Sequence, residues 1–361
     1  MDCLVVTPHR YGIAEVAERV GHEWAASGHD VDYLMPRGEA ARVGPITVGV
    51  PGIALWWRRT LQRLARESTH DLVWLHQPVA PTLPTRDPAF WRRAVVTFHT
   101  TERAEYRLAR DGVYPRRRLP YLWFTSRLEA RFYRKLAALG DDGPRFTAVA
   151  PHIADEASAL GAEDASVIPN GVFNPGSVDP AGIRAEHGIP EDATLVFNVA
   201  SLTPQKRPGV FAATMRRVVD DAASGTDGDP IYCVMAGKGP LQDAVERHTG
   251  DRLIAPGYVS DDEKWRWFAA ADVFASLSAY EGMPMAAAEA LSFDLPLVLS
   301  DVPAHRWLAE RPGVEARLVG DDADGLRRAI AAVADEQSDA ELPSWRAVAE
   351  RYIEIGPGGI G

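Results

Sequence analysis

Two successive series of apolar, strand-like runs, separated by helix-like segments, constrain the fold of this chain most strongly. The first series comprises residues 3–8, 29–35, 71–77, 94–99, 146–151 and 166–169, and the second comprises 194–201, 231–237, 252–257, 272–278 and 296–301. Uninterrupted apolar runs rich in β-branched residues and bounded by Gly, Pro and polar residues are typical of buried parallel strands. Strands that alternate with helices in two series predict an α/β protein with two Rossmann-like, doubly wound domains.

The length of 361 residues suits two domains of about 150 to 200 residues each. The boundary is expected within residues 170–194, a stretch rich in Gly, Pro and Asp that follows the last strand of the first series. We predict domains at 1–172 and 173–340, with a C-terminal helix and tail at 341–361 that pack back toward the first domain. Because ligands of open α/β sheets bind beyond the carboxyl ends of the strands, we expect the two domains to face each other across a cleft.

The composition is that of a soluble globular protein, with 46% hydrophobic and 25% charged residues. No apolar run reaches the roughly 18 residues of a spanning helix, and no signal peptide precedes the strand-like run at residue 3. The net charge of −11 argues against a nucleic-acid partner. Cys3 and Cys233 lie in separate strand-like runs, so we expect two unrelated buried thiols and a cytoplasmic location.

Two residues of the first half follow predicted strands. Gly12 lies where the chain enters a helix, so its backbone could approach a phosphate, although a plain turn would use the same residue. The first loop lacks the G-x-G-x-x-G pattern of nicotinamide dehydrogenases. His99 follows the run at 94–98, where either a role in a binding site or a capping role in the core fits.

The second half places cations and glycines after its strands. Lys206 and Arg207 lie in the loop "SLTPQKRP", where two cations would suit a diphosphate, or would form a solvated pair. Gly237 follows the next strand in "MAGKGPL", and Tyr258 and Val259 follow the third in "GYVSDDE".

The segment "SAYEGMPMAAAEALSFDLPLVLSD", residues 278–301, sets Glu281 and Glu289 eight positions apart around an alanine-rich turn. We expect Pro284 in the first helical turn, with Gly282 and Met283 at the mouth of the helix. Eight helical positions span roughly 12 Å, which is too far for a retaining hydrolase pair but fits two clamps at opposite ends of a sugar nucleotide. Two unrelated solvated glutamates are the alternative.

Together these motifs resemble those of retaining glycosyltransferases of the GT-B fold, in particular glycosyltransferase family 4. The stretch "EGMPMAAAE" matches the family's E-x7-E signature, and "IPNGV", "SLTPQKRP", "AGKGP" and "GYVSDDE" occur in the family's order. The resemblance covers nearly the whole chain and is strongest from about residue 168 to residue 301.

The resemblance implies that Glu289 binds the nucleotide ribose. Glu281, with the backbone of Gly282, Met283 and Pro284, would hold the donor sugar. Lys206 would neutralise the diphosphate leaving group.

Gly12 would bring its backbone close to the same diphosphate, and His99 would line the sugar pocket. The backbone near Tyr258 and Val259 would meet the base. The implied donor is a nucleoside diphosphate sugar with UDP, GDP or ADP as its carrier, and the implied acceptor is a glycan or lipid-linked hydroxyl. The implied mechanism retains configuration and uses no cofactor, metal ion or protein nucleophile.

The sequence departs from the family pattern in three places. Ser201 stands where an arginine usually partners the lysine on the phosphates, and Arg207 is a candidate replacement. The usual glycine pair of the first loop is Tyr11-Gly12, and Phe293-Asp294 replaces a common glycine after the E-x7-E helix. Ser201 keeps open the alternative of a non-catalytic sugar-nucleotide sensor or partner subunit.

Residues 114–135 form a basic, aromatic segment with seven basic residues and one acid, Glu129. Such a segment suits an anionic membrane surface, and the alternative is a core-packed helix with a solvated arginine face. We expect the protein to be cytoplasmic, with peripheral membrane association as a hypothesis. The candidate membrane residues are Arg116, Arg117, Arg118, Trp123, Phe124, Arg127, Arg131, Arg134 and Lys135.

Overall fold

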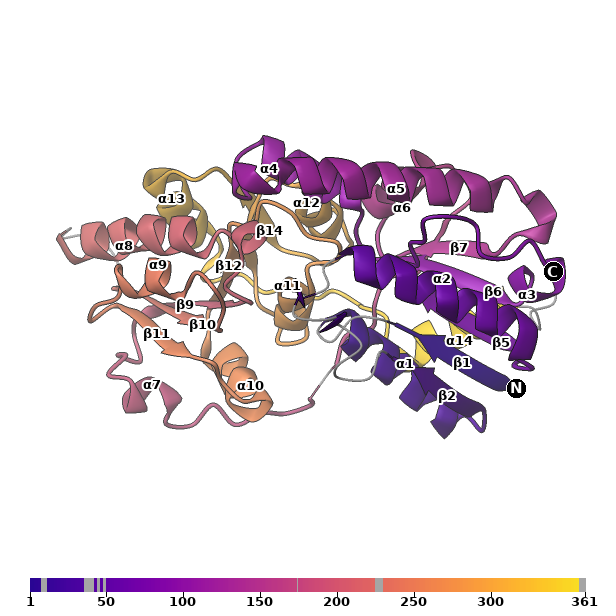
Figure 1. Ribbon diagram of the computed structural model, residues 1–361. Coiled ribbons are helices and arrows are strands. Elements are labelled where there is room, and N and C mark those ends of the chain that lie inside the picture. The colour runs from indigo at the N-terminus through magenta and orange to yellow at the C-terminus, as the bar shows by residue number, and fades with distance from the viewer. Residues whose placement is uncertain are drawn as a thin grey trace. The chain divides into compact units, whose positions relative to one another are not determined.

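The chain forms two compact units, one of Met1–Gly171 together with the C-terminal segment from Pro343, and the other of Val172–Leu342. The structure, a computed structural model, describes residues 1–7, 12–35, 42–43, 46–47, 50–173, 175–224 and 230–356. Each unit contains a parallel six-stranded sheet that carries helices (Figure 1). The predicted α/β class with two Rossmann-like sheets is therefore confirmed.

The first unit has the strand order β2-β1-β5-β6-β7-β8. Its strands are β1 (Asp2–Val6), β2 (Asp30–Leu34), β5 (Leu72–His76), β6 (Ala94–Phe98), β7 (Arg145–Ala148) and β8 (Ser166–Val167), with a separate hairpin of β3 (Arg42–Val43) and β4 (Ile46–Thr47). Its helices are α1 (Ile13–Ala26), α2 (Val50–Glu67), α3 (Pro88–Trp91), α4 (Glu102–Arg110), α5 (Leu119–Ala137), α6 (Pro151–Ser158) and α14 (Trp345–Ile355), with 3-10 turns at Arg116–Arg118 and Gly140–Asp142.

The C-terminal helix α14 belongs to the first unit and lies beside α1 (Figure 1). The indole N–H of Trp24 in α1 donates to the Ala349 carbonyl at 2.9 Å. The ring of Tyr352 lies 4.5 Å from that of Trp74 in β5, and both side chains are buried. Helix α14 therefore completes the core of this unit.

The second unit has the strand order β11-β10-β9-β12-β13-β14, the classic order of a dinucleotide-binding sheet. Its strands are β9 (Thr194–Val199), β10 (Ile231–Ala236), β11 (Leu253–Gly257), β12 (Val273–Ser276), β13 (Leu297–Ser300) and β14 (Ala316–Val319). Its helices are α7 (Ile183–Glu186), α8 (Pro208–Ser224), α9 (Gln242–Glu246), α10 (Asp261–Ala270), α11 (Met285–Leu291), α12 (Pro303–Ala309) and α13 (Ala323–Val333), with a 3-10 turn, η3, at Pro204–Lys206.

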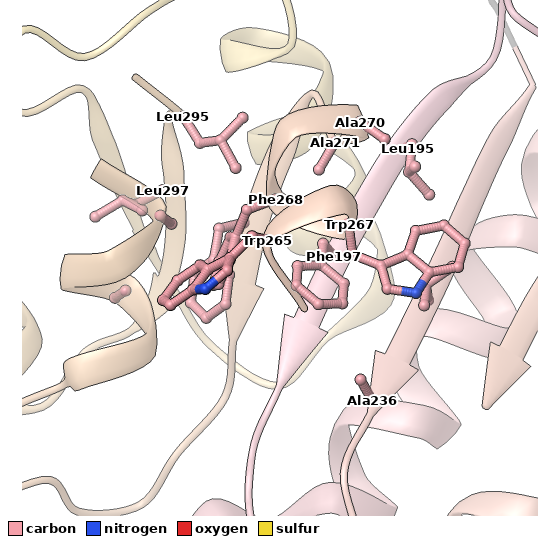
Figure 2. Close-up of a cluster of buried hydrophobic side chains, with 14 of the residues drawn as sticks. Leu195, Phe197, Ala236, Trp265, Trp267, Phe268, Ala270, Ala271, Leu295 and Leu297 are labelled. Atoms are coloured by element: carbon pink, nitrogen blue, oxygen red, sulfur yellow. The ribbon is translucent and has the colours of Figure 1, made fainter. Parts of the chain in front are cut away.

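Both faces of the second sheet are buried, because successive residues of a strand point to opposite faces. Leu195 and Phe197 of β9 enter one core with the aromatic side chains of α10 (Figure 2). Val196 of the same strand enters the other core, with residues of α8 and α13. Apolar runs without polar alternation are the sequence signature of such strands.

The expected buried thiols are confirmed: Cys3 of β1 and Cys233 of β10 are both buried and unpaired. Burial raises the pKa of the Cys3 thiol to about 11. The run at 29–35 differs from expectation, because β2 is an edge strand whose residues are half-buried or exposed. An edge strand has a neighbour on one side only, so it needs less apolar sequence.

Candidate functional site

The candidate residues of the second unit lie in the segments that follow the carboxyl ends of its strands. From β9 to β11 the chain adds strands toward one side of the sheet, and from β12 to β14 it adds them toward the other side. The switch point therefore lies between the neighbouring parallel strands β9 and β12. Open α/β sheets bind ligands beyond the carboxyl ends of the strands at such a switch point. Lys206 follows β9 and Glu281 follows β12, so the two candidate charges flank this position.

Backbone hydrogen bonds tie the loops of this edge together. The N–H of Ala279, after β12, donates to the Gln205 carbonyl, after β9, at 2.8 Å. The N–H of Leu202 donates to the Lys238 carbonyl at 3.0 Å, and the N–H of Gly237 donates to the Gly257 carbonyl at 2.7 Å. The loops after β9, β10, β11 and β12 therefore form one connected platform.

Gly237 has a structural reason to be a glycine. Its φ is +136°, and a Cβ there would lie 1.9 Å from the Ala200 carbonyl oxygen. Only glycine lets the loop after β10 approach the loop after β9 this closely. The sequence makes Gly237 a candidate for donor binding because it follows a strand, and the packing of the two loops explains the glycine independently.

Lys206 and Glu281 form an ion pair at the switch point. Lys206 ends η3, and its ammonium donates to Oε2 of Glu281. The Lys206 side chain is 22% exposed and that of Glu281 is 8% exposed, so the pair is largely withdrawn from water. A cation and a carboxylate thus lie together where a ligand with both phosphate and hydroxyl groups could contact them.

Arg207 and Ser201, the two residues considered for the missing phosphate-binding arginine, differ in their surroundings. Nη1 and Nη2 of Arg207 both donate to the carboxylate of Asp321. Arg207 has a positive φ of 49° and caps η3. Ser201 is exposed, and its carbonyl accepts the N–H of Thr203 at 2.7 Å. Arg207 thus directs two of the five N–H donors of its guanidinium at Asp321.

The E-x7-E segment is helical over a shorter range than we expected. Helix α11 begins at Met285, and Pro284 is its N-cap residue, so the prediction that Pro284 lies in the first turn is wrong by one position. The roughly 12 Å separation assumed a helix from Glu281 onward. Because residues 281–284 are not helical, that estimate does not apply.

Glu289 lies on α11 and contacts a different lysine. The ammonium of Lys264, in the first turn of α10, donates to Oε1 of Glu289 at 3.1 Å. The side chains are 16% and 15% exposed. The two carboxylates of the motif therefore each have a lysine partner, and the motif search had not singled out Lys264.

The remaining candidate residues of this unit surround the same loops. Tyr258 is 68% exposed directly after β11, and the ammonium of Lys238 lies 4.4 Å from the centre of its ring. Val259 is buried in the core, so only its backbone is available to a ligand. Gly282 is half-buried and Met283 is buried, between Glu281 and α11.

Gly12 lies at the carboxyl edge of the first unit. It is exposed and is the N-cap residue of α1. A Cβ there would have no atom of the described residues within 4 Å. Tyr11 lies outside the described residues.

His99 follows β6 and is buried beside a second histidine. Nδ1 of His76, the last residue of β5, shares a hydrogen bond with Nε2 of His99 at 3.0 Å. The two rings are stacked, with their centres 5.2 Å apart. The backbone N–H groups of His99 and Thr100 both point at Oε1 of Gln77, at 3.4 and 3.3 Å. His76 was missed, although "LVWLHQ" ends a strand with a histidine just as "AVVTFH" does.

Buried carboxylates lie between α4 and α5. Glu129 of α5 is fully buried and accepts the backbone N–H groups of Glu102 and Arg103 at the start of α4. Burial, reinforced by the charge of Glu102, raises the pKa of Glu129 well above its ordinary value, although these two hydrogen bonds oppose the shift. Burial also raises the pKa values of Glu102 and Glu105.

The basic segment places most of its candidate residues on the surface of α5 and the turn before it. Trp123 and Phe124 are 47% and 54% exposed, and the guanidinium of Arg127 lies 4.9 Å from the Trp123 ring. The exposed candidates are Arg116, Arg117, Trp123, Phe124, Arg127, Arg131, Arg134 and Lys135. Arg118 is only half-exposed and pairs with Glu105. Phe132 and Tyr133, also in this segment, are buried.

One group of possible metal ligands occurs among the described residues, at the opposite edge of the first sheet. It consists of Asp2, Asp32 and His70. Nε2 of His70 shares a hydrogen bond of 3.1 Å with Asp32 and lies 3.7 Å from Asp2. Separately, none of the described helices combines the length and the apolarity needed to cross a membrane.

Two protein-family models match the chain. The model described as Glycosyltransferase Family 4 matches residues 11–173, and that described as Glycosyl transferases group 1 matches residues 181–344. The fold is also that of sucrose-phosphate synthase from Thermosynechococcus elongatus, with a TM-score of 0.66. That alignment covers 98% of this chain and 93% of the other at 16% identity, so the likeness concerns the fold.

Curated relatives match over part of their length. The UDP-Gal:alpha-D-GlcNAc-diphosphoundecaprenol alpha-1,3-galactosyltransferase of Escherichia coli is 27% identical over 183 residues, which are 48% of this chain and 46% of that protein. The D-inositol 3-phosphate glycosyltransferase of Nocardioides sp. is 28% identical over 215 residues, which are 51% of this chain and 45% of that protein. The matched region thus spans less than half of either relative.

Proposed function

This chain belongs to the GT-B glycosyltransferases of the family 4 type, and on that premise we propose that it transfers a sugar from a nucleoside diphosphate sugar to an acceptor hydroxyl. The observation that carries the proposal is the Lys206–Glu281 pair at the switch point of the second sheet. A donor that inserts there would exchange the ion pair for a diphosphate on the lysine and sugar hydroxyls on the carboxylate. We assign the donor site to this unit.

Each candidate side chain has a chemical role in the proposal. Lys206 stabilises the negative charge that develops on the diphosphate as the sugar leaves. Glu281 and the backbone of Gly282, Met283 and Pro284 hold the donor sugar, and Glu289 accepts hydrogen bonds from the ribose. The backbone at Tyr258 and Val259 meets the base.

From the first unit, we assign Gly12 to the diphosphate and His99 to the donor sugar. The place of Gly12 at the start of α1 and that of His99 directly after β6 support these roles.

The proposed reaction retains the anomeric configuration. The acceptor oxygen bonds to the anomeric carbon on the face from which the diphosphate departs, and the bond from that carbon to the phosphate oxygen breaks. The acceptor proton passes to the departing phosphate oxygen. The protein supplies position and charge and no nucleophile, and we propose that Lys206 provides the cation at the leaving group without a metal ion.

We propose a lipid-linked or otherwise amphiphilic acceptor at an anionic membrane surface on the cytoplasmic side. The exposed arginines and aromatic side chains of α5 support this, because they combine charge with apolar area. Glu129, the acid of this segment, is buried and therefore does not reduce the positive charge of the surface. The name of the E. coli relative, with its diphosphoundecaprenol acceptor, supports the same class.

Thermal unfolding with UDP, GDP and ADP tests the donor site. At 100 times its Kd, a nucleotide should stabilise the protein by about 2.7 kcal/mol, or roughly 5 to 10 °C for a unit of this size. Lys206→Ala and Glu289→Ala should lose most of that shift. Arg216→Ala, which removes an exposed ion pair on α8, is the matched control and should keep it. If none of the three nucleotides stabilises the wild-type protein, the proposal is wrong.

Vesicle co-sedimentation tests the membrane surface. Vesicles with anionic phospholipid should bind the wild type, and zwitterionic vesicles should not, since each basic residue contributes about 1 kcal/mol near an anionic surface. The double variant Arg127→Glu and Arg131→Glu should bind at least tenfold more weakly. Arg346→Glu with Arg351→Glu makes the same charge change on α14, and unaltered binding is expected. Equal losses in both double variants would contradict a surface on α5.

One observation favours the second candidate function, a non-catalytic sugar-nucleotide sensor. Ser201 offers no positive charge, and Arg207 is engaged by Asp321. A sensor would bind the nucleotide and release no sugar. Turnover of radiolabelled UDP-sugars in the presence of lipid-diphosphate acceptors separates the two functions, because only a transferase would move the label to the lipid. A variant Ser201→Arg should raise the turnover of a true transferase, because it adds a cation beside the diphosphate.

A further inference from the structure

We propose that Lys264 is a positioning residue for nucleotide binding, and that it holds the Glu289 carboxylate in the orientation that accepts the ribose hydroxyls. The inference rests on the proposed function, because it assumes that Glu289 binds ribose. It adds a residue outside the E-x7-E motif to the donor site.

The contact between the two side chains is direct and shielded. Nζ of Lys264 lies 3.1 Å from Oε1 of Glu289, and both side chains are about 15% exposed. The ammonium also lies 3.5 Å from Asp261, whose side chain is 76% exposed. Shielding strengthens the pair with Glu289 relative to the pair with Asp261, because water screens the exposed carboxylate.

An aromatic platform fixes the lysine. Its ammonium lies 3.9 Å from the centre of the Trp265 ring, within the range of a cation–π interaction. Trp265 is buried and stacks with Phe268 and Phe293, at ring-centre distances of 6.0 Å each. Figure 2 shows Trp265 and Phe268 in the packed core beside the sheet. A rigid ring beneath the ammonium restricts where the ammonium can lie.

The backbone connects this lysine to the loop proposed for the base. Helix α10 begins at Asp261, after Tyr258, Val259 and the N-cap residue Ser260. The N–H of Lys264 donates to the Ser260 carbonyl at 2.8 Å. Lys264 therefore links the loop after β11 to Glu289 on α11, so that the proposed base and ribose contacts share one support.

The chemistry of the pair suits hydrogen bonding to hydroxyl groups. An ionised carboxylate has about four lone-pair directions, so a carboxylate can accept from an ammonium and from ribose hydroxyls at the same time. Asp261, Asp262 and Glu263 crowd negative charge into the same turn of α10, and Lys264 compensates it beside Glu289. Without the cation, Glu289 would lose its ion pair with α10.

The preference for a ribose over a deoxyribose separates a positioning role from a merely structural one. The probes are UDP and 2′,3′-dideoxy-UDP, or the GDP or ADP pair if UDP does not bind, measured by calorimetry. Charged hydrogen bonds to hydroxyl groups predict that the wild type binds the ribonucleotide about 10 to 100 times more tightly. Lys264→Met should reduce this ratio to within about threefold while the affinity for the dideoxy nucleotide stays unchanged. A purely structural role would weaken both nucleotides equally.

Three further single variants and one double variant complete the test. Lys264→Arg keeps a cation and should retain most of the preference. Lys238→Met is the matched control, because it removes another lysine that lies over an aromatic ring at the same edge, and it should leave the ratio unchanged. Glu289→Gln should abolish the preference, and adding Lys264→Met to it should change nothing more.

The outcomes distinguish this inference from the proposed function. If the wild type binds none of the nucleotides, both are wrong. If Glu289→Gln loses the ribose preference and Lys264→Met keeps it, only the role of Lys264 is overturned. If Lys264→Met and Lys238→Met lower the ratio equally, the effect is one of general charge, and the inference is likewise overturned.

Discussion

Two glycines of the second unit allow the effect of a steric clash to be measured against a matched control. Gly237 directly follows β10 and has a φ of +136°, and Gly257 is the last residue of the neighbouring β11 and has a φ of +83°. A Cβ at Gly237 would lie 1.9 Å from the Ala200 carbonyl oxygen, whereas a Cβ at Gly257 would have no neighbour within 4 Å among the described residues. Both changes to alanine strain the backbone, and only one creates a clash.

The expected free energies of unfolding follow from this difference. Gly257→Ala should cost about 1 to 2 kcal/mol, the usual cost of a left-handed conformation for a residue with a Cβ. Gly237→Ala adds an overpacking cost of about 1 to 3 kcal/mol, because the Ala200 carbonyl belongs to the backbone and cannot rotate away. We therefore expect a total of about 2 to 5 kcal/mol at Gly237.

Thermal unfolding provides the assay. For a unit of this size, each kcal/mol lowers the melting temperature by about 2 to 4 °C, so Gly237→Ala should melt several degrees below Gly257→Ala. The loop after β9 should also shift in Gly237→Ala. The Gly237→Ala variant should therefore lose more affinity for the nucleotide than the Gly257→Ala variant. Equal melting temperatures for the two variants would refute the conclusion that the approach of the two loops requires glycine.

Three further predictions concern interactions in the two cores. Folding raises the pKa of Glu129, so the contribution of Glu129 to stability is fully present at pH values below the ordinary pKa of glutamate. This contribution is lost as the pH rises through the pKa that Glu129 has in the folded state. Between these two pKa values, urea unfolding should show the free energy of unfolding of Glu129→Gln rising relative to that of the wild type by about 1.4 kcal/mol per pH unit. A difference that does not change with pH would contradict this. Asp272→Ala should lower the stability of the second unit by about 2 to 3 kcal/mol in urea titrations, because Asp272 accepts from Arg184 and from the Leu195 N–H. Thr97→Val should cost about 1 to 3 kcal/mol in calorimetry of the first unit, since its buried hydroxyl accepts an indole N–H at 2.7 Å, and an unchanged melting temperature would exclude that role.

Most of the fold could be predicted from the sequence, because buried parallel strands leave uninterrupted apolar runs. The family and the doubly wound sheets are confirmed. The prediction missed β14 at Ala316–Val319, an edge strand with exposed residues and a central arginine, Arg317. It also missed the two-residue strands of the β3–β4 hairpin, which are too short for any periodicity. Edge and short strands depend on neighbours that a local pattern does not reveal.

The candidate site was only partly predictable. Position after a strand singled out Lys206 and Glu281 as candidates in the second unit and His99 as a candidate in the first, because the parallel strands of one sheet end at the same edge. It could not identify Lys264, which lies inside a helix and becomes relevant only through its contact with Glu289. The pairs of Lys206 with Glu281 and Arg207 with Asp321 join residues 75 and 114 positions apart, a separation at which sequence alone gives no partner.

The lysines of this chain are few and lie mostly in one region, so that chemical modification of lysine can probe that region. The chain has 39 basic residues, and only four of them are lysines: Lys135, Lys206, Lys238 and Lys264. Three of the four lie around the carboxyl edge of the second sheet, and Lys135 lies on α5 in the other unit. Lysine acylation measured by peptide mass spectrometry would therefore report on the accessibility of this edge at three of the four lysines. Lys135 would serve as an internal reference, and occupancy of the site could be followed without introducing any mutation.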